Sequence, residues 1–379
     1  MDALSYSSEH EQFRTTARRF IDKEIAPYHA QWEKDGIVSR ELWRKAGAAG
    51  LLLTDIPAEY GGAGADFLTI GIMTEEMMRG MYTGPGFRVH SDIVARYILH
   101  YGSEELKQKW LPRMASGEVV GAIAMTEPGT GSDLQSVRTM AVRDGDDYVI
   151  TGQKTFITNG QHADLVIVIC KTDTTAGAGA KGVSLILVEA DRPGFSRGRN
   201  LEKIGLKAQD TSELFFENVR VPVSNRLGDE GRGFAYLMQE LPRERLLIGI
   251  GAVAAMEAVL GWTLDYTKQR KAFGKPIIDF QNSRFKLAEV KTEVKIARVF
   301  LDHCTALHMK GLLDVPTAAM CKLWLTEAYG RVVDTCLQLH GGYGYMWEYP
   351  VARAYADARV SRIFGGANEI MKEIIGRSL

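Results

Sequence analysis

The chain has 379 residues, of which 45% are apolar, so it is long enough for two or three domains with a large buried core. Lys and Arg number 46 against 47 for Asp and Glu, which gives a formal net charge of −1. A balanced charge provides no field that attracts nucleic acid or an anionic membrane, so neither is an expected partner.

The cysteines and the apolar runs indicate the compartment. The four cysteines lie far apart in apolar stretches without CxxC spacing, which favours buried free thiols and no metal site. The N-terminal stretch resembles neither a secretory signal nor a transit peptide, and the longest apolar run, 246–256, is too short to span a membrane. We therefore expect a bacterial-type cytoplasmic protein without a membrane span, although a mature mitochondrial form would have the same features.

The first third of the chain has helical periodicity. Ser8 and Glu11 match a capping box, and apolar residues recur at helical spacing from Phe13 to Ile25, until Pro27 is expected to end the run. Further helical patterns cover 42–49, 67–79 and 93–101, and Ser103 is placed to cap another helix. We expect an N-terminal helical domain over residues 1–118.

The pattern then changes twice. Short β-branched or aromatic runs at 148–150, 165–170, 183–188 and 214–216 predict a middle β domain over residues 119–230. Long helical patterns, broken at 274–276, 311–316 and 341–344, predict a C-terminal four-helix bundle over residues 231–379. The predicted fold class is therefore mixed α and β, mostly α, and the absence of repeated βαβ units argues against a Rossmann fold.

Two segments of the β domain have the composition of a binding site. Residues 125–133 read MTEPGTGSD, where glycines let backbone N–H groups approach a ligand closely. Residues 154–160 read KTFITNG and place Phe156 and Thr158 on one side of a strand, an aromatic face beside a hydroxyl. Taken alone, the segments also fit an ordinary turn and an ordinary strand.

Two segments of the C-terminal part suit a pyrophosphate. Residues 270–275 read RKAFGK and are followed by Gln281, and residues 338–344 read QLHGGYG. Guanidinium groups bind phosphate oxygens bidentately, and glycines expose N–H donors. The alternative for these segments is a solvated basic helix end and a turn between helices.

These four segments, in this order and at these separations, resemble the acyl-CoA dehydrogenase family over nearly the whole chain. Residues 239–372 resemble the long-chain type in particular. The resemblance implies an acyl-CoA dehydrogenase-like fold and an FAD flavoprotein of fatty acid β-oxidation. It also implies oxidation of an acyl-CoA to the trans-2-enoyl-CoA, with flavin N5 taking the β hydride, electron transfer to an electron-transferring flavoprotein, and a homotetramer built as a dimer of dimers.

The family resemblance also implies the site residues. The flavin ring would contact Met125, Thr126, Ser132, Phe156, Ile157 and Thr158, and Ser132 would also touch the thioester. The far end of the FAD would be reached from a neighbouring subunit by Arg270, Phe273, Gln281, Gln338, Leu339, His340, Gly341 and Gly342. The C-terminal motif would add Ala367, Asn368 and Glu369 on the FAD side, although Ala367 stands where the family usually has Thr and lacks the hydroxyl.

The position of the base departs from the commonest family pattern. Removing a proton α to a thioester requires a carboxylate over that carbon and hydrogen bonds to the developing enolate. Most relatives carry this glutamate in a C-terminal YEGT-type motif, but Gly365 stands at that position here. A minority, including the long-chain and isovaleryl types, takes its base from the position that Glu244 matches.

The remaining thioester contacts would come from Arg245, Gly365 and Gly366. Gly365 is expected both to leave room for the relocated Glu244 side chain and to offer a backbone N–H. A solvated surface position is the alternative for Glu244, and Glu369 is the rival carboxylate.

Two other functions share this scaffold. An acyl-CoA oxidase would pass electrons to O₂, and a DNA-binding flavoprotein would carry an added basic domain, which the balanced charge disfavours. The length and branching of the acyl chain are left open by the sequence.

Overall fold

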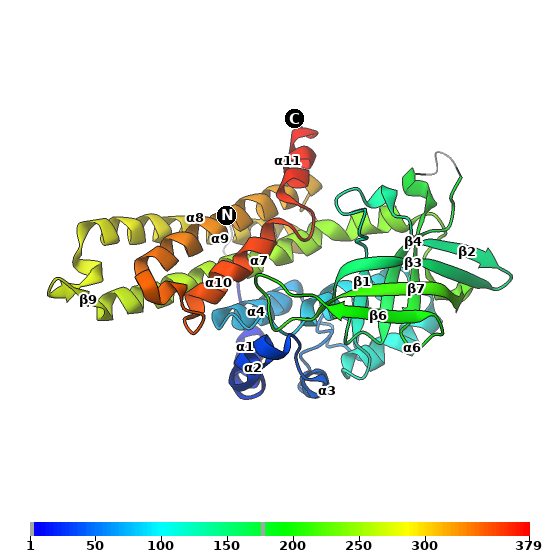
Figure 1. Cartoon of the computed structure of the whole chain (residues 1–379), viewed down its shortest axis with the longest axis horizontal. Coiled ribbons are helices and arrows are strands. Elements are labelled where there is room, and N and C mark those ends of the chain that lie inside the picture. The colour runs from blue at the N-terminus through cyan, green and yellow to red at the C-terminus, as the bar shows by residue number, and fades with distance from the viewer. Residues whose placement is uncertain (1–3, 176–178) are drawn as a thin grey trace.

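The computed structural model describes residues 4–175 and 179–379, and in this part helices precede and follow one β-sheet (Figure 1). The helices before the sheet are α1 Ser8–Phe20, α2 Ala26–Asp35, α3 Arg40–Ala48, α4 Phe67–Arg79, α5 Ala95–Tyr101 and α6 Glu104–Ala115. Two π-helical turns, Ile21–Ile25 and Val89–Val94, precede α2 and α5. The predicted fold class, mostly helical with a central sheet between two helical parts, is confirmed.

Two expectations about the first helix are wrong. The N-cap is Ser7 and not Ser8, because the Ser7 hydroxyl accepts from the His10 backbone N–H at 3.3 Å while His10 Nδ1 accepts from the Ser7 N–H at 3.0 Å. Pro27 does not end the helical run, since it lies in the first turn of α2, where its missing N–H has no intrahelical partner to lose. The π-helical turn carries the chain from α1 into α2 and keeps Ile21 and Ile25 buried.

The sheet separates two apolar cores. Its strands are β1 Gly121–Ala124, β2 Met140–Asp144, β3 Asp147–Thr158, β4 Leu165–Lys171, β5 Val183–Glu189, β6 Phe195–Asn200, β7 Thr211–Pro222 and β8 Arg226–Leu227. They lie in the order β6-β7-β3-β2-β4-β5-β8, with β1 paired in parallel to β4. Alternate residues of β4 point into opposite cores. Leu165 and Ile167 pack with the N-terminal helices, and Val166 and Val168 pack in the core on the other face of the sheet.

The helices after the sheet form the bundle. They are α7 Gly233–Gln269, α8 Gln281–Met309, α9 Val315–His340, α10 Pro350–Ala358 and α11 Asn368–Gly376. A small hairpin of β9 Lys271–Ala272 and β10 Lys275–Pro276 joins α7 to α8. Figure 1 shows α7 running from the sheet to this hairpin at the opposite end of the bundle.

Helix α7 is the central helix of the bundle. Among the described residues it alone is long and apolar enough, by length and composition, to cross a membrane, yet 72% of its most apolar window is buried inside the protein. Its apolar side chains, such as Leu247 and Val253, share a core with α8 and α9. The apolar surface of α7 is therefore used by the bundle.

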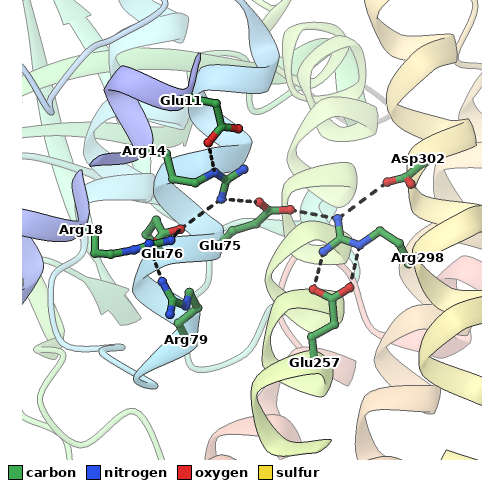
Figure 2. A network of polar contacts seen from close by, with 9 residues as sticks. All are labelled: Glu11, Arg14, Arg18, Glu75, Glu76, Arg79, Glu257, Arg298 and Asp302. Atoms are coloured by element: carbon green, nitrogen blue, oxygen red, sulfur yellow. Dashed lines mark hydrogen bonds and ion pairs between the residues drawn. The ribbon is translucent and has the colours of Figure 1, made fainter. Parts of the chain in front are cut away.

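A network of charged side chains joins the N-terminal helices to the bundle (Figure 2). Glu75 on α4 lies between Arg14 on α1, at 3.1 Å, and Arg298 on α8, at 2.9 Å. Arg298 also forms two hydrogen bonds to Glu257 on α7, at 2.8 and 2.7 Å. The network fixes α4 against α7 and α8, which positions the elements that carry the site.

All four cysteines are buried and free, as predicted. No group of three or more His, Cys, Asp or Glu side chains in the described part of the chain is arranged to hold a metal ion.

Candidate active site

Glu244 lies near the start of α7 and is buried, with 8% of its surface exposed. Its Oε1 accepts a hydrogen bond from the hydroxyl of Tyr97 on α5 at 3.2 Å. Tyr97 is itself fully buried. The alternative of a solvated surface acid is therefore wrong for Glu244, because this carboxyl group is enclosed between α5 and α7.

The surroundings of Glu244 raise the pKa of its carboxyl group to about 7. Burial is the main cause, and the negative charge of Glu240 acts in the same direction. The hydrogen bond from Tyr97 and the charges of Arg243 and Arg245 oppose the shift. A carboxyl group with this pKa is both ionised often enough and basic enough to take a proton near neutral pH.

The glycine pair of the C-terminal motif packs on α7 beside Glu244. Gly365 and Gly366 have φ values of +64° and +95°, a conformation that glycine adopts without strain. A Cβ on Gly365 would lie 2.3 Å from Cδ1 of Ile248, and a Cβ on Gly366 would lie 3.8 Å from Nη2 of Arg245. The side chain that fills the space left by Gly365 is thus Ile248, one turn beyond Glu244, and not Glu244 as expected.

Lys322 of α9 anchors this glycine loop, and sequence reasoning missed it. Its buried ammonium donates to the carbonyl of Gly366 at 2.7 Å and to Oδ1 of Asn368 at 2.8 Å. Burial, with the nearby charge of Arg245, lowers the pKa of Lys322 to about 8. The only sequence signal was a lysine in an otherwise apolar stretch of helical spacing.

The start of α11 offers a ligand mainly its backbone. Ala367 is the N-cap and makes no side-chain capping bond, and the Asn368 side chain is engaged with Lys322, Thr326 and Glu327. Glu369 is exposed in the first turn of α11. Its carboxylate is therefore open to solvent, unlike that of Glu244.

The loop 125–139 follows β1 and is held by a buried ion pair that sequence reasoning did not identify. Glu127 accepts from Lys154 Nζ at 2.9 Å and from the backbone N–H groups of Arg138 and Thr139 at 2.6 and 2.9 Å. Lys154 Nζ also donates to the carbonyl of Met125 at 3.1 Å, and the Thr155 N–H donates to the carbonyl of Thr126 at 2.9 Å. The MTEPGTGSD and KTFITNG segments are therefore joined into one unit.

The outer surface of this unit is open. A Cβ at Gly129 or Gly131 would meet no atom within 4 Å, and Ser132 is exposed. Phe156 lies at an irregularity in the pairing of β3 with β7, has a φ of +60°, and keeps 67% of its surface exposed. An exposed aromatic ring on a strained backbone is suited to stack against a planar apolar ligand.

The irregularity interrupts the alternation of the strand around Phe156. Thr155 and Ile157 are buried, Phe156 is exposed and Thr158 is half-buried, so the expected sharing of one side by Phe156 and Thr158 stays a prediction. Asn159 follows with its side chain donating to the carbonyls of Gly86 and Gly121 at 3.1 and 3.2 Å. These bonds place the segment against the N-terminal helices, so Ile157 offers a ligand its backbone rather than its side chain.

The second set of predicted cofactor residues lies at the other end of the bundle. Arg270, Phe273 and Gln281 surround the hairpin after α7 and are exposed, Phe273 by 96%. The turn Gln338–Gly342 faces the same end, since the Arg270 guanidinium lies 5.4 Å from the Tyr343 ring and His340 stacks on Tyr266. Gln338 is exposed, Leu339 is half-buried and His340 is buried, and a Cβ on Gly341 or Gly342 would meet no atom within 4 Å.

The structure of one chain does not bring the two sets together. Helix α7 separates them, and its 37 residues span about 55 Å at the usual helical rise. Both sets nevertheless fit parts of a dinucleotide: the first has the exposed ring and open glycine loop that suit a flavin, and the second has exposed cations and open glycines that suit phosphates. We refer to the two sets as two candidate half-sites.

Comparisons with known proteins agree with these features. The family models described as the N-terminal, middle and C-terminal domains of acyl-CoA dehydrogenase match residues 7–118, 122–219 and 231–379. The chain is 54% identical over 374 residues to the mitochondrial long-chain specific acyl-CoA dehydrogenase of Sus scrofa, which covers 99% of this chain and 87% of that protein.

Two solved structures extend the comparison. The crystal structure of an acyl-CoA dehydrogenase from Geobacillus kaustophilus superposes with a TM-score of 0.97 at 50% identity, covering 100% of this chain and 99% of that one. A glutaryl-CoA dehydrogenase from Mycobacterium smegmatis in complex with FADH2 gives a TM-score of 0.90 at 30% identity, covering 98% and 95% of the two chains.

Proposed function

This chain belongs to the acyl-CoA dehydrogenase family of FAD-dependent oxidoreductases, and we propose that it oxidises an acyl-CoA to the trans-2-enoyl-CoA with Glu244 as its base. The observation that carries the proposal is the buried Glu244 carboxyl group, with a pKa of about 7, beside the Gly365–Gly366 loop. FAD, when bound, supplies the acceptor at N5 for the hydride that leaves the β carbon.

Glu244 takes one of the two protons of the α carbon through Oε1 or Oε2, and Tyr97 orients the carboxylate by donating a hydrogen bond to it. The backbone N–H groups of Gly365 and Gly366 bind the thioester oxygen, where negative charge develops as the proton leaves. Lys322 supports this role, because it fixes the Gly366 carbonyl and so orients the loop. Arg245 and Ser132 complete the thioester contacts.

We propose that the flavin ring lies on the unit formed by Met125, Thr126, Ser132, Phe156, Ile157 and Thr158. The phosphates and the far end of FAD then lie on Arg270, Phe273, Gln281 and the Gln338–Gly342 turn of another subunit. The length of α7, about 55 Å, supports this sharing, because the hairpin and the Gln338–Gly342 turn lie at its far end, away from the sheet that carries the flavin unit. A homotetramer built as a dimer of dimers provides such a partner for every chain.

The electron acceptor in this proposal is an electron-transferring flavoprotein, with O₂ as the competing acceptor of an oxidase. We keep the cytoplasm as the expected location, since the similar proteins include bacterial as well as mitochondrial ones. Peroxide formed in air at the rate of substrate consumption would identify an oxidase instead.

The experiment that tests the proposal is anaerobic bleaching of the flavin absorption by acyl-CoAs of graded length and branching. The wild type should bleach, whereas Glu244→Gln should bind the same thioester and bleach slower by a factor of about 10² to 10⁴. Glu373→Gln is the control, because it neutralises an exposed acid of α11 outside both half-sites, and it should bleach like the wild type. Glu369→Gln tests the rival carboxylate.

Normal bleaching by Glu244→Gln together with slow bleaching by Glu369→Gln would reassign the base. A purified protein that neither carries FAD nor takes it up would contradict the whole proposal.

A further inference from the structure

Arg88 is a deeply placed arginine without a protein partner. It directly precedes the π-helical turn Val89–Val94, and burial lowers the pKa of its guanidinium. Its Nε is buried and makes no hydrogen bond, and no carboxylate in the described part of the chain lies within 4.0 Å of its guanidinium. The side chain as a whole is only half-buried, so part of the guanidinium surface is left uncovered by protein.

The neighbouring arginines, unlike Arg88, form ion pairs. Arg96 and Arg243 share the carboxylate of Asp55, at 2.6 and 2.9 Å, and Arg243 also donates to the backbone carbonyl of Asp92 at 2.7 Å. Asp92 lies one helical turn after Arg88 and attracts it, but burial raises the pKa of this carboxyl group to about 7 and the two form no close ion pair. The cluster therefore leaves one cation, Arg88, uncompensated.

The guanidinium of Arg88 points at the face of α7 that carries the proposed base. Its Nη1 lies 3.3 Å from the position that a Cβ on Gly251 would occupy. Glu244, Ile248 and Gly251 follow at i, i+4 and i+7 and so share one face of α7. Measured along the axis of α7, Gly251, the residue that faces Arg88, lies about 10 Å beyond Glu244.

A second unpartnered polar atom lies at the same place. The buried hydroxyl Oγ1 of Thr74 on α4 makes no hydrogen bond, and the methyl carbon of this residue lies 3.8 Å from the same Gly251 position. A buried donor without an acceptor is unfavourable, and an uncompensated buried cation is more so. Thr74 therefore brings an unpartnered hydroxyl close to Arg88, although its methyl group and not Oγ1 is the atom nearest Gly251, and one ligand group could satisfy both residues.

We infer that Arg88 and Thr74 bind a carboxylate at the distal end of the acyl chain, so that the preferred substrates are mono-CoA thioesters of α,ω-dicarboxylic acids. The inference rests on the proposed function and names its substrate class. An extended chain with C–C bonds of about 1.5 Å advances about 1.25 Å along its axis per carbon, so the distance of about 10 Å corresponds to roughly eight further carbons and to an acid of about ten carbons.

The chemistry of Arg88 favours a carboxylate over a plain chain end. A guanidinium binds a carboxylate through two parallel N–H donors, and such charge-assisted bonds are the strongest hydrogen bonds available to it. An unsubstituted chain of the same length would place a methyl group against an unpaired cation. Sites built to hydrogen-bond a substrate group discriminate strongly against the analogue that lacks the group.

The test compares paired thioesters of equal length, one ending in a methyl group and one in a carboxylate, over a series from about six to about sixteen carbons. We expect the wild type to prefer the carboxylate form most strongly near ten carbons. Arg88→Met should lower kcat/KM for that form roughly ten- to a hundredfold and leave or raise it for the methyl form. Arg88→Lys should restore part of the preference, and Arg199→Met, which removes an exposed cation on β6, should change neither.

Binding is measured separately by calorimetry in the Glu244→Gln background, where the thioester stays intact. The Kd of the carboxylate form should rise roughly ten- to a hundredfold when Arg88→Met is added, while the methyl form binds as before.

Two results would overturn the inference and leave the proposed function standing. One is equal use of both forms by the wild type and by Arg88→Met. The other is a change only in the preferred length of methyl-ended chains, which would make Arg88 the closed end of the acyl site. If neither form binds or bleaches the flavin, the proposed function fails and the inference fails with it.

Discussion

Replacing Tyr97 by phenylalanine removes the one hydrogen bond that the described structure gives to the Glu244 carboxylate. Burial and the charge of Glu244 raise the pKa of Tyr97 well above the ordinary tyrosine value, so its hydroxyl is always a donor at working pH. The other charged groups around Glu244 are Glu240, Arg243 and Arg245, and the substitution leaves all three in place.

The expected changes in the pKa of Glu244 and in the rate follow from the strength of this hydrogen bond. A hydrogen bond to a charged group contributes about 1.5–3 kcal/mol, and the length of 3.2 Å places this one at the lower end. Since one pKa unit corresponds to about 1.4 kcal/mol, losing the bond should raise the pKa of Glu244 by about one unit. From a starting value of about 7, the ionised fraction at pH 7 falls from about one half to about one tenth, a roughly fivefold lower rate.

The assay is the anaerobic rate of flavin reduction, followed by stopped flow at saturating acyl-CoA from about pH 5 to about pH 9. Tyr97→Phe should move the acidic limb of the profile upward by about one pH unit and reach the wild-type rate at high pH. Tyr101→Phe is the control, because its hydroxyl bonds to Gln239 and Glu240 and not to Glu244.

An unchanged acidic limb, or an equal loss of rate at every pH, would refute the assignment of this limb to Glu244 and of Tyr97 to its support.

Three further predictions concern stability. Burial raises the pKa of Glu244 from 4.5 to about 7, so its ionised form destabilises the fold by about 3 kcal/mol. This destabilisation is absent below pH 4.5 and complete above pH 7. Glu244→Gln should therefore raise the unfolding free energy, measured by denaturant titration, at pH 8 and not at pH 4. Gly365→Ala should lower the Tm and the bleaching rate, because its Cβ would meet Cδ1 of Ile248 at 2.3 Å. Adding Ile248→Val, which removes that atom, should recover part of the Tm. If the Tm does not recover, the positive φ of residue 365 alone is responsible for the loss. Glu76→Gln should lower the unfolding free energy by about 2 kcal/mol, because buried Glu76 accepts from Arg14, Arg18 and Arg79. Burial raises the pKa of Glu76, but these bonds lower it to below the ordinary value of 4.5, so the loss should be complete above pH 4.5 and shrink as the pH falls below it. The exposed Glu373→Gln should show no such pH-dependent loss.

The sequence predicted the parts of the fold whose periodicity is unambiguous. Helix α4 was located at its observed bounds, and the breaks at 274–276 and 341–344 fall between the long helices of the bundle. The break at 311–316 begins between α8 and α9 and overlaps the first two residues of α9. Strands β4 and β5 were visible as unbroken apolar runs because both of their faces are buried. The strands β1, β2, β6 and β8 were missed, since they are short or largely polar. In addition, β1 and β8 pair with strands that lie far away in sequence.

The sequence alone predicted only part of the site. The resemblance pointed to Glu244, but only the packing of α5 against α7 shows that its carboxyl group is buried and bonded to Tyr97. The supports of the binding loops were not identified: Lys322 stood in no motif, and Glu127 and Lys154 lay in the two quoted segments without any sign that they pair. Such residues act through contacts between distant segments, and a polar side chain in an apolar stretch is the one local sign of them.

The length of α7 has a thermodynamic consequence. If each FAD is held between the start of α7 in one subunit and the end of α7 in another, cofactor occupancy and subunit association become linked equilibria. Dilution of the protein should then release flavin even when each half-site is intact, and added FAD should draw dissociated subunits together. The apparent affinity for FAD would be a property of the protein concentration as much as of the residues that contact it.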